Sequence, residues 1–169
     1  MTAGTLRTQG TELYLVDKLS SSVEQVVKFA CPTGITGIGG GTKDQLEDTC
    51  LDNEEDKTYK AGLGNPNAIS VPFNFIPSSF SHQTLWDLKA SGENQEWMVG
   101  FSDGRGIAPT LDSEGHFVPP ASPLRTTIGF DGYVSEVNID VATNEIVRGT
   151  LTIQRSGPER PFWNGPQPT

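Results

Sequence analysis

The chain has 169 residues, a formal net charge of −9 at pH 7 and a sequence pI near 4.6. Such an acidic surface repels phosphate, which argues against a nucleic-acid-binding protein of the usual basic kind. Hydrophobic residues make up only 34% of the chain, which also contains 19 glycines and 12 prolines. We therefore expect one domain with a modest core, extended arms and long loops that become ordered against neighbouring subunits.

The cysteines and the lack of long apolar runs indicate the compartment. Cys31 and Cys50 are the only cysteines, and residues 1 to 10 are polar, unlike a signal peptide. We expect reduced cytoplasmic thiols, with a disulfide between them as the alternative. No apolar run approaches the ~20 residues that a membrane span needs. These features predict a soluble protein.

The first third of the chain contains two short strands and a glycine-rich segment. After a loose N-terminal arm at residues 1–11, alternation predicts strands at Glu12 to Asp17 and Gln25 to Cys31. Residues 34–41 read GITGIGGG, with five glycines in eight positions. The segment lacks the Gly-Lys-Ser/Thr of a P-loop, and it does not complete the GxGxxG dinucleotide fingerprint. Flexibility and unusual backbone angles are the better explanation for these glycines.

The next segment is the most acidic part of the chain. Seven carboxylates and no basic residue lie between residues 44 and 56. The glycine that a calcium-binding loop needs at its sixth position is missing, whether the count starts at Asp48 or at Asp52. Residues 42–66 show no hydrophobic period, and we expect a long acidic loop with Tyr59 and Leu63 as its anchors. Structureless loops of this length in a compact domain are usually functional or disordered.

A strand, a helix and another strand follow. Ala68 to Ile76 and Gln95 to Ser102 alternate as strands. Between them, a helix is predicted from the serines Ser78 and Ser79, one of which would cap it, to about Ala90. Its predicted buried stripe consists of Phe80, Thr84, Leu85 and Leu88. Residues 103–125 are expected to form a second long loop.

The strongest pattern in the sequence is a long β-hairpin from Thr126 to Arg155. Its second arm places Leu151 and Ile153 opposite a polar face. The apolar phase changes along the first arm, which predicts a bulge or bend at Gly132. Residues 157–169 form a C-terminal arm in which Phe162 and Trp163 either anchor a partner or fold back on the domain.

Catalytic chemistry is not indicated anywhere in the chain. The only histidines are His82, which is expected to cap or pack on the helix, and His116 in the second loop. Neither belongs to a metal-ligand spacing, and no GxSxG nucleophile elbow is present. We therefore expect a protein that is not an enzyme and that binds no cofactor and no metal.

Three segments carry a resemblance to a known family. They are GGGTKDQLEDTCLDNEEDKTYKAG from Gly39, ISVPFNFIPSSFSHQTLWDLKASGENQEWMVGFSDG from Ile69, and IGFDGYVSEVNIDVATNEIVRGTLTIQRSG from Ile128. Together they resemble the tail tube (major tail) proteins of long-tailed bacteriophages, the lambda-like family, over residues 12–156. The resemblance implies a mainly β fold, namely an antiparallel β-sandwich or barrel with a single packed helix and long assembly loops.

The resemblance also implies a function. Family members form rings, usually hexameric, that stack into a hollow tube, and genome DNA passes through it without specific binding. The expected location is the virion tail, after synthesis in the host cytoplasm. The expected partners are further copies of the chain and the tape-measure, tail-terminator and baseplate proteins.

Two residue sets follow as expectations for the assembly. Contacts between subunits or rings are expected from Leu46, Leu51, Tyr59, Leu63, Phe162 and Trp163. Channel-facing positions are expected at Glu136, Asn138, Asp140, Thr150 and Thr152. The alternatives are a tail-terminator or baseplate ring, a type VI secretion-like tube, and a carbohydrate-binding β-sandwich with Trp86, Trp97 and Trp163 as sugar platforms.

Overall fold

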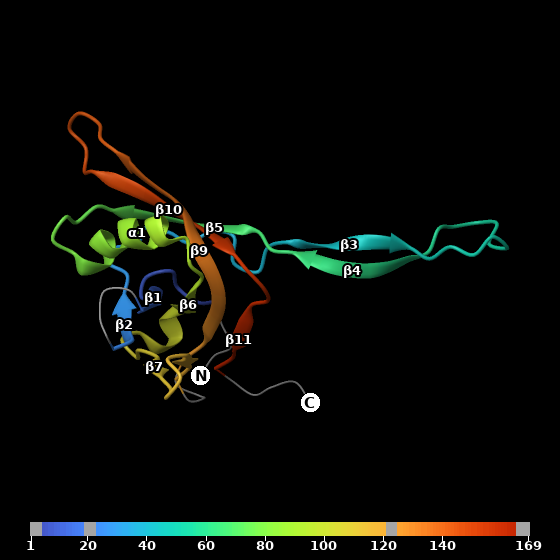
Figure 1. Cartoon of the computed structure of the whole chain (residues 1–169), viewed down its shortest axis with the longest axis horizontal. Coiled ribbons are helices and arrows are strands. Elements are labelled where there is room, and N and C mark those ends of the chain that lie inside the picture. Colours follow the sequence, from blue (N-terminus) through green and yellow to red (C-terminus); the bar gives the residue numbers. More distant parts are fainter. Residues whose placement is uncertain (1–4, 19–22, 121–124, 165–169) are drawn as a thin grey trace.

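The computed structural model describes residues 5–18, 23–120 and 125–164 (Figure 1). One antiparallel sheet forms the body, in the order β2 (Gln25–Lys28), β1 (Glu12–Asp17), β6 (Gln95–Gly100), β9 (Thr127–Asp140), β10 (Arg148–Arg155) and β5 (Ala68–Asn74). A further strand, β11 (Arg160–Phe162), pairs with the start of β9. The predicted mainly β fold with one helix is confirmed.

The two outer strands of this sheet are joined by the segment that follows β2. The amide of Phe29 donates to the Leu13 carbonyl of β1, and the amide of Asn74 donates to the Cys31 carbonyl. Isolated bridges then pair Pro32 with Phe73 and Thr36 with Ser70 of β5. Because this segment continues from β2 and bridges to β5, the sheet curls around its main core, as in a β-sandwich or barrel.

The core sits inside this curled sheet and confirms the predicted alternation. Its fully buried side chains on the strands include Leu13, Leu15, Ile69, Val71, Phe73, Trp97, Val99, Phe130, Leu151 and Ile153. The Trp97 indole N–H donates to the Gly132 carbonyl at 3.1 Å, so the largest core side chain leaves no orphan donor.

The helix α1 (Phe80–Ser91) covers part of the core with Leu85 and Leu88. Phe80 is 44% exposed, which corrects its predicted place in the buried stripe. Ser79 stands at the N-cap, as predicted, but its side chain makes no capping hydrogen bond. Gly92 ends the helix in the left-handed conformation. No helix in residues 5–18, 23–120 and 125–164 is long and apolar enough to span a membrane.

His82 has a structural role, as predicted from its place on the helix. Its Nδ1 accepts a hydrogen bond from the Ile76 amide at 3.0 Å, and its Nε2 donates to the Ala30 carbonyl at 2.7 Å. The buried imidazole also packs against Phe29 and Phe73. Both ring nitrogens are therefore used to tie the helix to the strands.

The bulge in the long hairpin lies at Ser135, which corrects its predicted position at Gly132. The register pairs Thr152 with Glu136 but Ile153 with Val134, so Ser135 is the extra residue. Val134 is consequently buried and Tyr133 is 38% exposed. Gly132 serves close packing instead, because a Cβ there would lie 2.7 Å from the carbonyl oxygen of Gln154.

The two expected long loops contain strands. Residues 42–66 form a β-hairpin of β3 (Thr42–Glu47) and β4 (Tyr59–Asn65) that projects from the body (Figure 1). The second loop contains a 3₁₀ turn, η1 (Ser102–Gly104), and a short hairpin of β7 (Thr110–Leu111) and β8 (Phe117–Val118). This short hairpin contributes Phe117 to a second small core with Tyr14, Val16 and Met98.

A buried ion pair ties the start of the sheet together. The Arg125 side chain is fully buried, and its Nη1 donates to Glu12 Oε2 at 2.8 Å. The guanidinium also donates to Tyr14 and to four backbone carbonyls, those of Phe101, Ile107, Gly10 and Gly100. The cation is therefore compensated by one carboxylate and by hydrogen bonds from several segments.

We expect the Glu12 carboxylate to make the protein acid-sensitive. Burial raises the pKa of Glu12, but hydrogen bonds from Lys28, Tyr14 and Arg125 outweigh burial and lower this pKa from 4.5 to about 2. Its contribution, on the order of 3 kcal/mol, is therefore complete above pH 4.5 and is lost as the pH falls through about 2. Urea unfolding at several pH values should show this loss in the native chain but not in E12Q. If the free energy of unfolding fell equally at low pH in the native chain and in E12Q, the role of Glu12 would be contradicted.

Candidate assembly surfaces

The hairpin β3–β4, called the arm below, has no core of its own. Nearly every residue of both strands is exposed, and none belongs to either hydrophobic cluster of the body. Isolated two-stranded ribbons are marginally stable in water. A ribbon that projects in this way is therefore suited to binding a surface outside its own subunit (Figure 1).

The arm carries four of the six apolar residues predicted for assembly, but it does not gather them in one patch. Tyr59 pairs with Glu47 and Leu46 pairs with Lys60, so Tyr59 and Leu46 lie on opposite faces. Leu63, 83% exposed, lies where the register shifts, and Leu51 is fully exposed near the tip. The arm thus presents apolar side chains on both faces, as an element inserted between two surfaces would.

The far end of the arm carries excess negative charge. Lys57 pairs with Glu47 at 3.6 Å and Lys60 pairs with Asp48 at 2.6 Å. The remaining tip carboxylates, Asp52, Glu54, Glu55 and Asp56, form no ion pair within the described residues. Cys50 lies in the same region, and both it and Cys31 are free, exposed thiols. The tip is organised by backbone contacts, such as the Thr58 hydroxyl donating to the Asp48 carbonyl at 2.7 Å.

All five predicted channel-facing residues lie on one face of the sheet. Directly opposed residues of antiparallel strands share a face. Three such rows cross β9, β10 and β5, namely Asp140–Arg148–Asn74, Asn138–Thr150–Pro72 and Glu136–Thr152–Ser70. The other face carries Leu151 and Ile153 of the core. The curled sheet therefore presents a polar outer surface, called the polar face below, that includes two carboxylates and one arginine.

The C-terminal segment folds back on its own domain. β11 pairs Arg160 with Gly129 and Phe162 with Thr127 of β9, and Trp163 remains 52% exposed. Asn164 donates to Asp103 at 3.2 Å. Burial raises the pKa of Asp103, but hydrogen bonds from Thr126 and Asn164 outweigh it and lower this pKa below its usual value. Of the two predicted alternatives, the segment folds back, and it still exposes one aromatic ring.

One stretch of β9 has an open edge. β6 pairs with β9 only as far as Gly132, and β10 pairs with it on the other side up to Asp140. From Tyr133 to Asp140, no described strand pairs with the β6 side of β9. Open edges offer unpaired amide and carbonyl groups to another strand.

Comparison with known proteins identifies the family to which this chain belongs. Residues 4–164 match the family described as phage tail tube, TTP, lambda-like. The chain belongs to this family. It is 36% identical over 154 residues to "Structural protein 3" of Pseudomonas phage PAJU2, and the match covers 90% of both chains. The tail tube resemblance is therefore confirmed, and the chain is a structural protein of a phage tail.

Solved tail structures share the fold of this tail tube protein at low sequence identity. A chain from the tail of an empty GTA particle has a TM-score of 0.64 and 13% identity, with 92% of this chain and 98% of that chain covered. A chain from the SPP1 tail tube has a TM-score of 0.60 and 10% identity, with 92% of this chain and 77% of that chain covered. A chain from the structure of the PVC sheath/tube terminator of an extracellular contractile injection system has a TM-score of 0.65 and 10% identity, with 96% of this chain and 99% of that chain covered.

The tryptophans do not form the platform that a carbohydrate-binding module needs. Trp97 is fully buried in the core, whereas Trp86 is 43% exposed on the helix and Trp163 is 52% exposed after β11. Sugar-binding platforms require exposed aromatic rings, and one of the three predicted rings is not available. The family match and this burial both argue against the carbohydrate-binding alternative.

Proposed function

We propose that this tail tube protein assembles into hexameric rings that stack into a tube, and that genome DNA leaves the virion through it. The observation that carries the proposal is the exposed arm, a two-stranded ribbon of a tail tube family member that has no core contact in its own subunit. The GTA tail with the same fold was refined with C6 symmetry, which supports rings of six.

Within a ring, the open edge of β9 is the proposed contact between subunits. Pairing of residues 133–140 with a strand of the neighbouring copy would use the unpaired amides and carbonyls and would extend the sheet around the ring. This edge belongs to the strand that carries Glu136, Asn138 and Asp140 of the polar face. Ring closure would therefore place copies of the polar face side by side.

Between rings, the arm is the proposed contact. Leu46, Leu51, Tyr59 and Leu63 would become buried on a subunit of the next ring, as would the exposed ring of Trp163 and its neighbour Phe162. Full burial of such side chains contributes roughly 1.5–3 kcal/mol each. Six arms in each ring would multiply this contribution, which explains why a marginal ribbon can form a stable tube.

The polar face is the proposed channel wall. Glu136, Asp140, Asn138, Thr150 and Thr152 offer two carboxylates and neutral polar groups to passing DNA. Arg148 is the one cation of the face, and it lies opposite Asp140, which lowers its net attraction for phosphate. A wall of this kind releases few counterions from DNA and so binds it weakly. Tape-measure, tail-terminator and baseplate proteins would contact this surface or the ends of the tube. The tail tube protein itself would be synthesised in the host cytoplasm before it assembles.

Helical reconstruction of the purified protein by cryo-electron microscopy tests these assignments together. We expect long tubes with sixfold symmetry, the polar face inside and the arm crossing to the next ring. Single rings that do not stack would favour a terminator, the second candidate, because the PVC sheath/tube terminator shares this fold. A protein that stays monomeric at every concentration, or a tube with the polar face outside, would contradict the proposal.

A further inference from the structure

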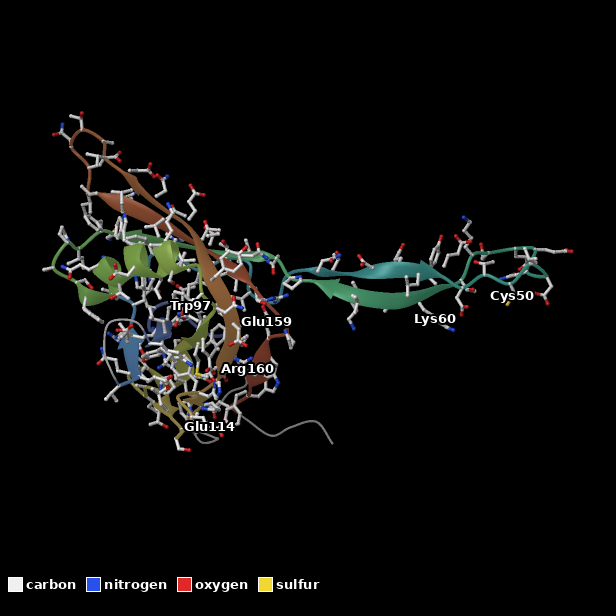
Figure 2. The ribbon with its side chains drawn as sticks, viewed as in Figure 1. Cys50, Lys60, Trp97, Glu114, Glu159 and Arg160 are labelled. Carbon is white, nitrogen blue, oxygen red and sulfur yellow. The ribbon has the colours of Figure 1, made fainter. Side chains whose placement is uncertain are left out.

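The glycine-rich segment GITGIGGG lies at the root of the arm, directly before β3. Its last residues, Gly39, Gly40 and Gly41, precede Thr42, the first residue of β3. On the neighbouring side lie the end of β10 and the residues that lead to β11. Figure 2 shows Glu159 close to the place where the arm leaves the body. The root is therefore where the C-terminal part of the chain meets the arm.

Two side chains from the C-terminal part hold the segment before β3. The Arg155 guanidinium forms an ion pair with the Glu159 carboxylate and donates to the Gly40 carbonyl at 3.0 Å. Glu159 Oε1 also accepts the Gly39 amide at 2.7 Å. Only 10% of the Arg155 side chain and 16% of the Glu159 side chain are exposed. Charge-assisted hydrogen bonds that are shielded in this way are stronger than those on an open surface.

The strand that returns from the arm is held on the same body. The Gln154 side chain donates to the Pro66 carbonyl at 3.2 Å, and the Asn67 side chain donates to the Gly37 carbonyl at 2.8 Å. The segment before β3 is thus held by Arg155 and Glu159, and the end of β4 is held by Gln154 of β10. Asn67, just before β5, links the returning segment to the glycine-rich segment.

The glycines are required by the close packing at this root. A Cβ at Gly41 would lie 2.4 Å from the Asn65 carbonyl oxygen and 3.2 Å from Arg155 Nη2, and its φ is +103°. A Cβ at Gly40 would lie 2.5 Å from Asn67 Nδ2. Only glycine allows the backbone to approach these groups and to adopt this φ. The glycine-rich segment, which lacks the signature of a phosphate-binding loop, therefore serves to let the arm pack closely where it joins the body.

We propose that Arg155 and Glu159 form a clamp that fixes the direction of the arm relative to the body. The arm has no packing contact of its own with the core, so its direction is set where its backbone leaves the sheet. The clamp bonds two consecutive glycines there, which are the residues with the widest choice of backbone angles. By fixing this direction, Arg155 and Glu159 act as positioning residues for assembly. This role in assembly rests on the proposed docking of the arm on the next ring.

The two native cysteines allow a direct test in the dilute full-length monomer. Cys50 near the arm tip and Cys31 on the body are both free and exposed, so each can carry a nitroxide label. Double electron–electron resonance then measures the distance distribution between arm and body. The native chain should give a single narrow peak. E159A and R155A should lose this peak and give a broad distribution, because the arm can then sample several directions.

A matched variant separates the clamp from a general effect of charge or stability. Glu145 is an exposed carboxylate in the turn between β9 and β10, and E145A removes the same charge as E159A but should keep the narrow peak. Circular dichroism should show the same folded spectrum for all variants. Because Glu159 lies outside β10 and β11, E159A keeps the test valid if R155A fails to fold. A narrow, unshifted peak in folded E159A would overturn the clamp.

Assembly provides the second readout. If the arm docks on the next ring, folded E159A should form fewer and shorter tubes than E145A under the same conditions. Normal tubes from E159A, despite a broadened distribution, would overturn the positioning role. Failure of the native chain to form tubes would count against the proposed function alone, because the distance measurement is made on the monomer.

Discussion

Removal of residues 43–64, with Thr42 joined to Asn65 through an Asn-Gly turn, is expected to give a folded protein that forms no tubes. Thr42 and Asn65 are direct partners in the register, so a two-residue hairpin turn can close the gap. The arm contributes no residue to the core, and its loss should therefore leave the body intact. Circular dichroism checks the fold, and negative-stain microscopy counts the tubes.

The whole ribbon has to be removed for this result to be interpretable. A deletion of residues 53–64 alone would remove most of β4 and leave β3 as an unpaired strand that could aggregate. As a milder variant, replacing both Tyr59 and Leu63 by serine should reduce tube length while keeping the ribbon. E54A, which removes a tip carboxylate, serves as the control with normal tubes. Tubes of native length from the deletion variant would exclude the arm as the contact between rings.

Substitution of Arg125 by alanine is expected to lower the free energy of unfolding by about 3–5 kcal/mol, a large part of the stability of a single domain. The change removes one of the two cations that pair with the buried Glu12 carboxylate, the other being Lys28, and it removes a donor from the Phe101 and Gly100 carbonyls. Urea denaturation at pH 7 measures the effect. Assembly should suffer as well, because fewer folded subunits are present.

An exposed ion pair provides the control for Arg125. Lys60 pairs with Asp48 at 2.6 Å on the arm, and both side chains are largely exposed. K60A should cost no more than about 1 kcal/mol, because water and salt screen such pairs. The double variant E12L/R125M should be more stable than R125A, because it removes the buried carboxylate together with its buried cation. A cost for R125A as small as that for K60A would show that the buried pair does not stabilise the sheet.

Strands that are buried on one side could be predicted from the sequence. In β5 and β10, alternation placed Ile69, Val71, Leu151 and Ile153 inside, because a strand that covers a core must bury every second side chain. The order of elements and the three family-like segments were enough to indicate a tail tube protein. Glu136, Asn138 and Asp140 share a face as the sequence predicted, since all three lie on the same side of the bulge and period two holds there.

The strands of the arm could not be predicted from the sequence because neither face of the hairpin is buried. Leu46, Tyr59 and Leu63 follow no hydrophobic period, so residues 42–66 could only be predicted as a loop. The backbone hydrogen bonds that make them strands depend on the pairing of Thr42 with Asn65 and Glu47 with Tyr59. Two paired strands with both faces exposed to water leave no hydrophobic alternation in a single sequence.

Tertiary structure alone decided the contacts between distant residues. Arg125 and Glu12 are 113 positions apart, and Glu159 and Gly39 are 120 apart. Each pair meets only because the curled sheet brings segments that are distant in the sequence into contact. The charges and glycines are visible in the sequence, but their partners are chosen by the closure of the sheet. The clamp at the root of the arm and the buried ion pair therefore belong to the fold and not to any local pattern.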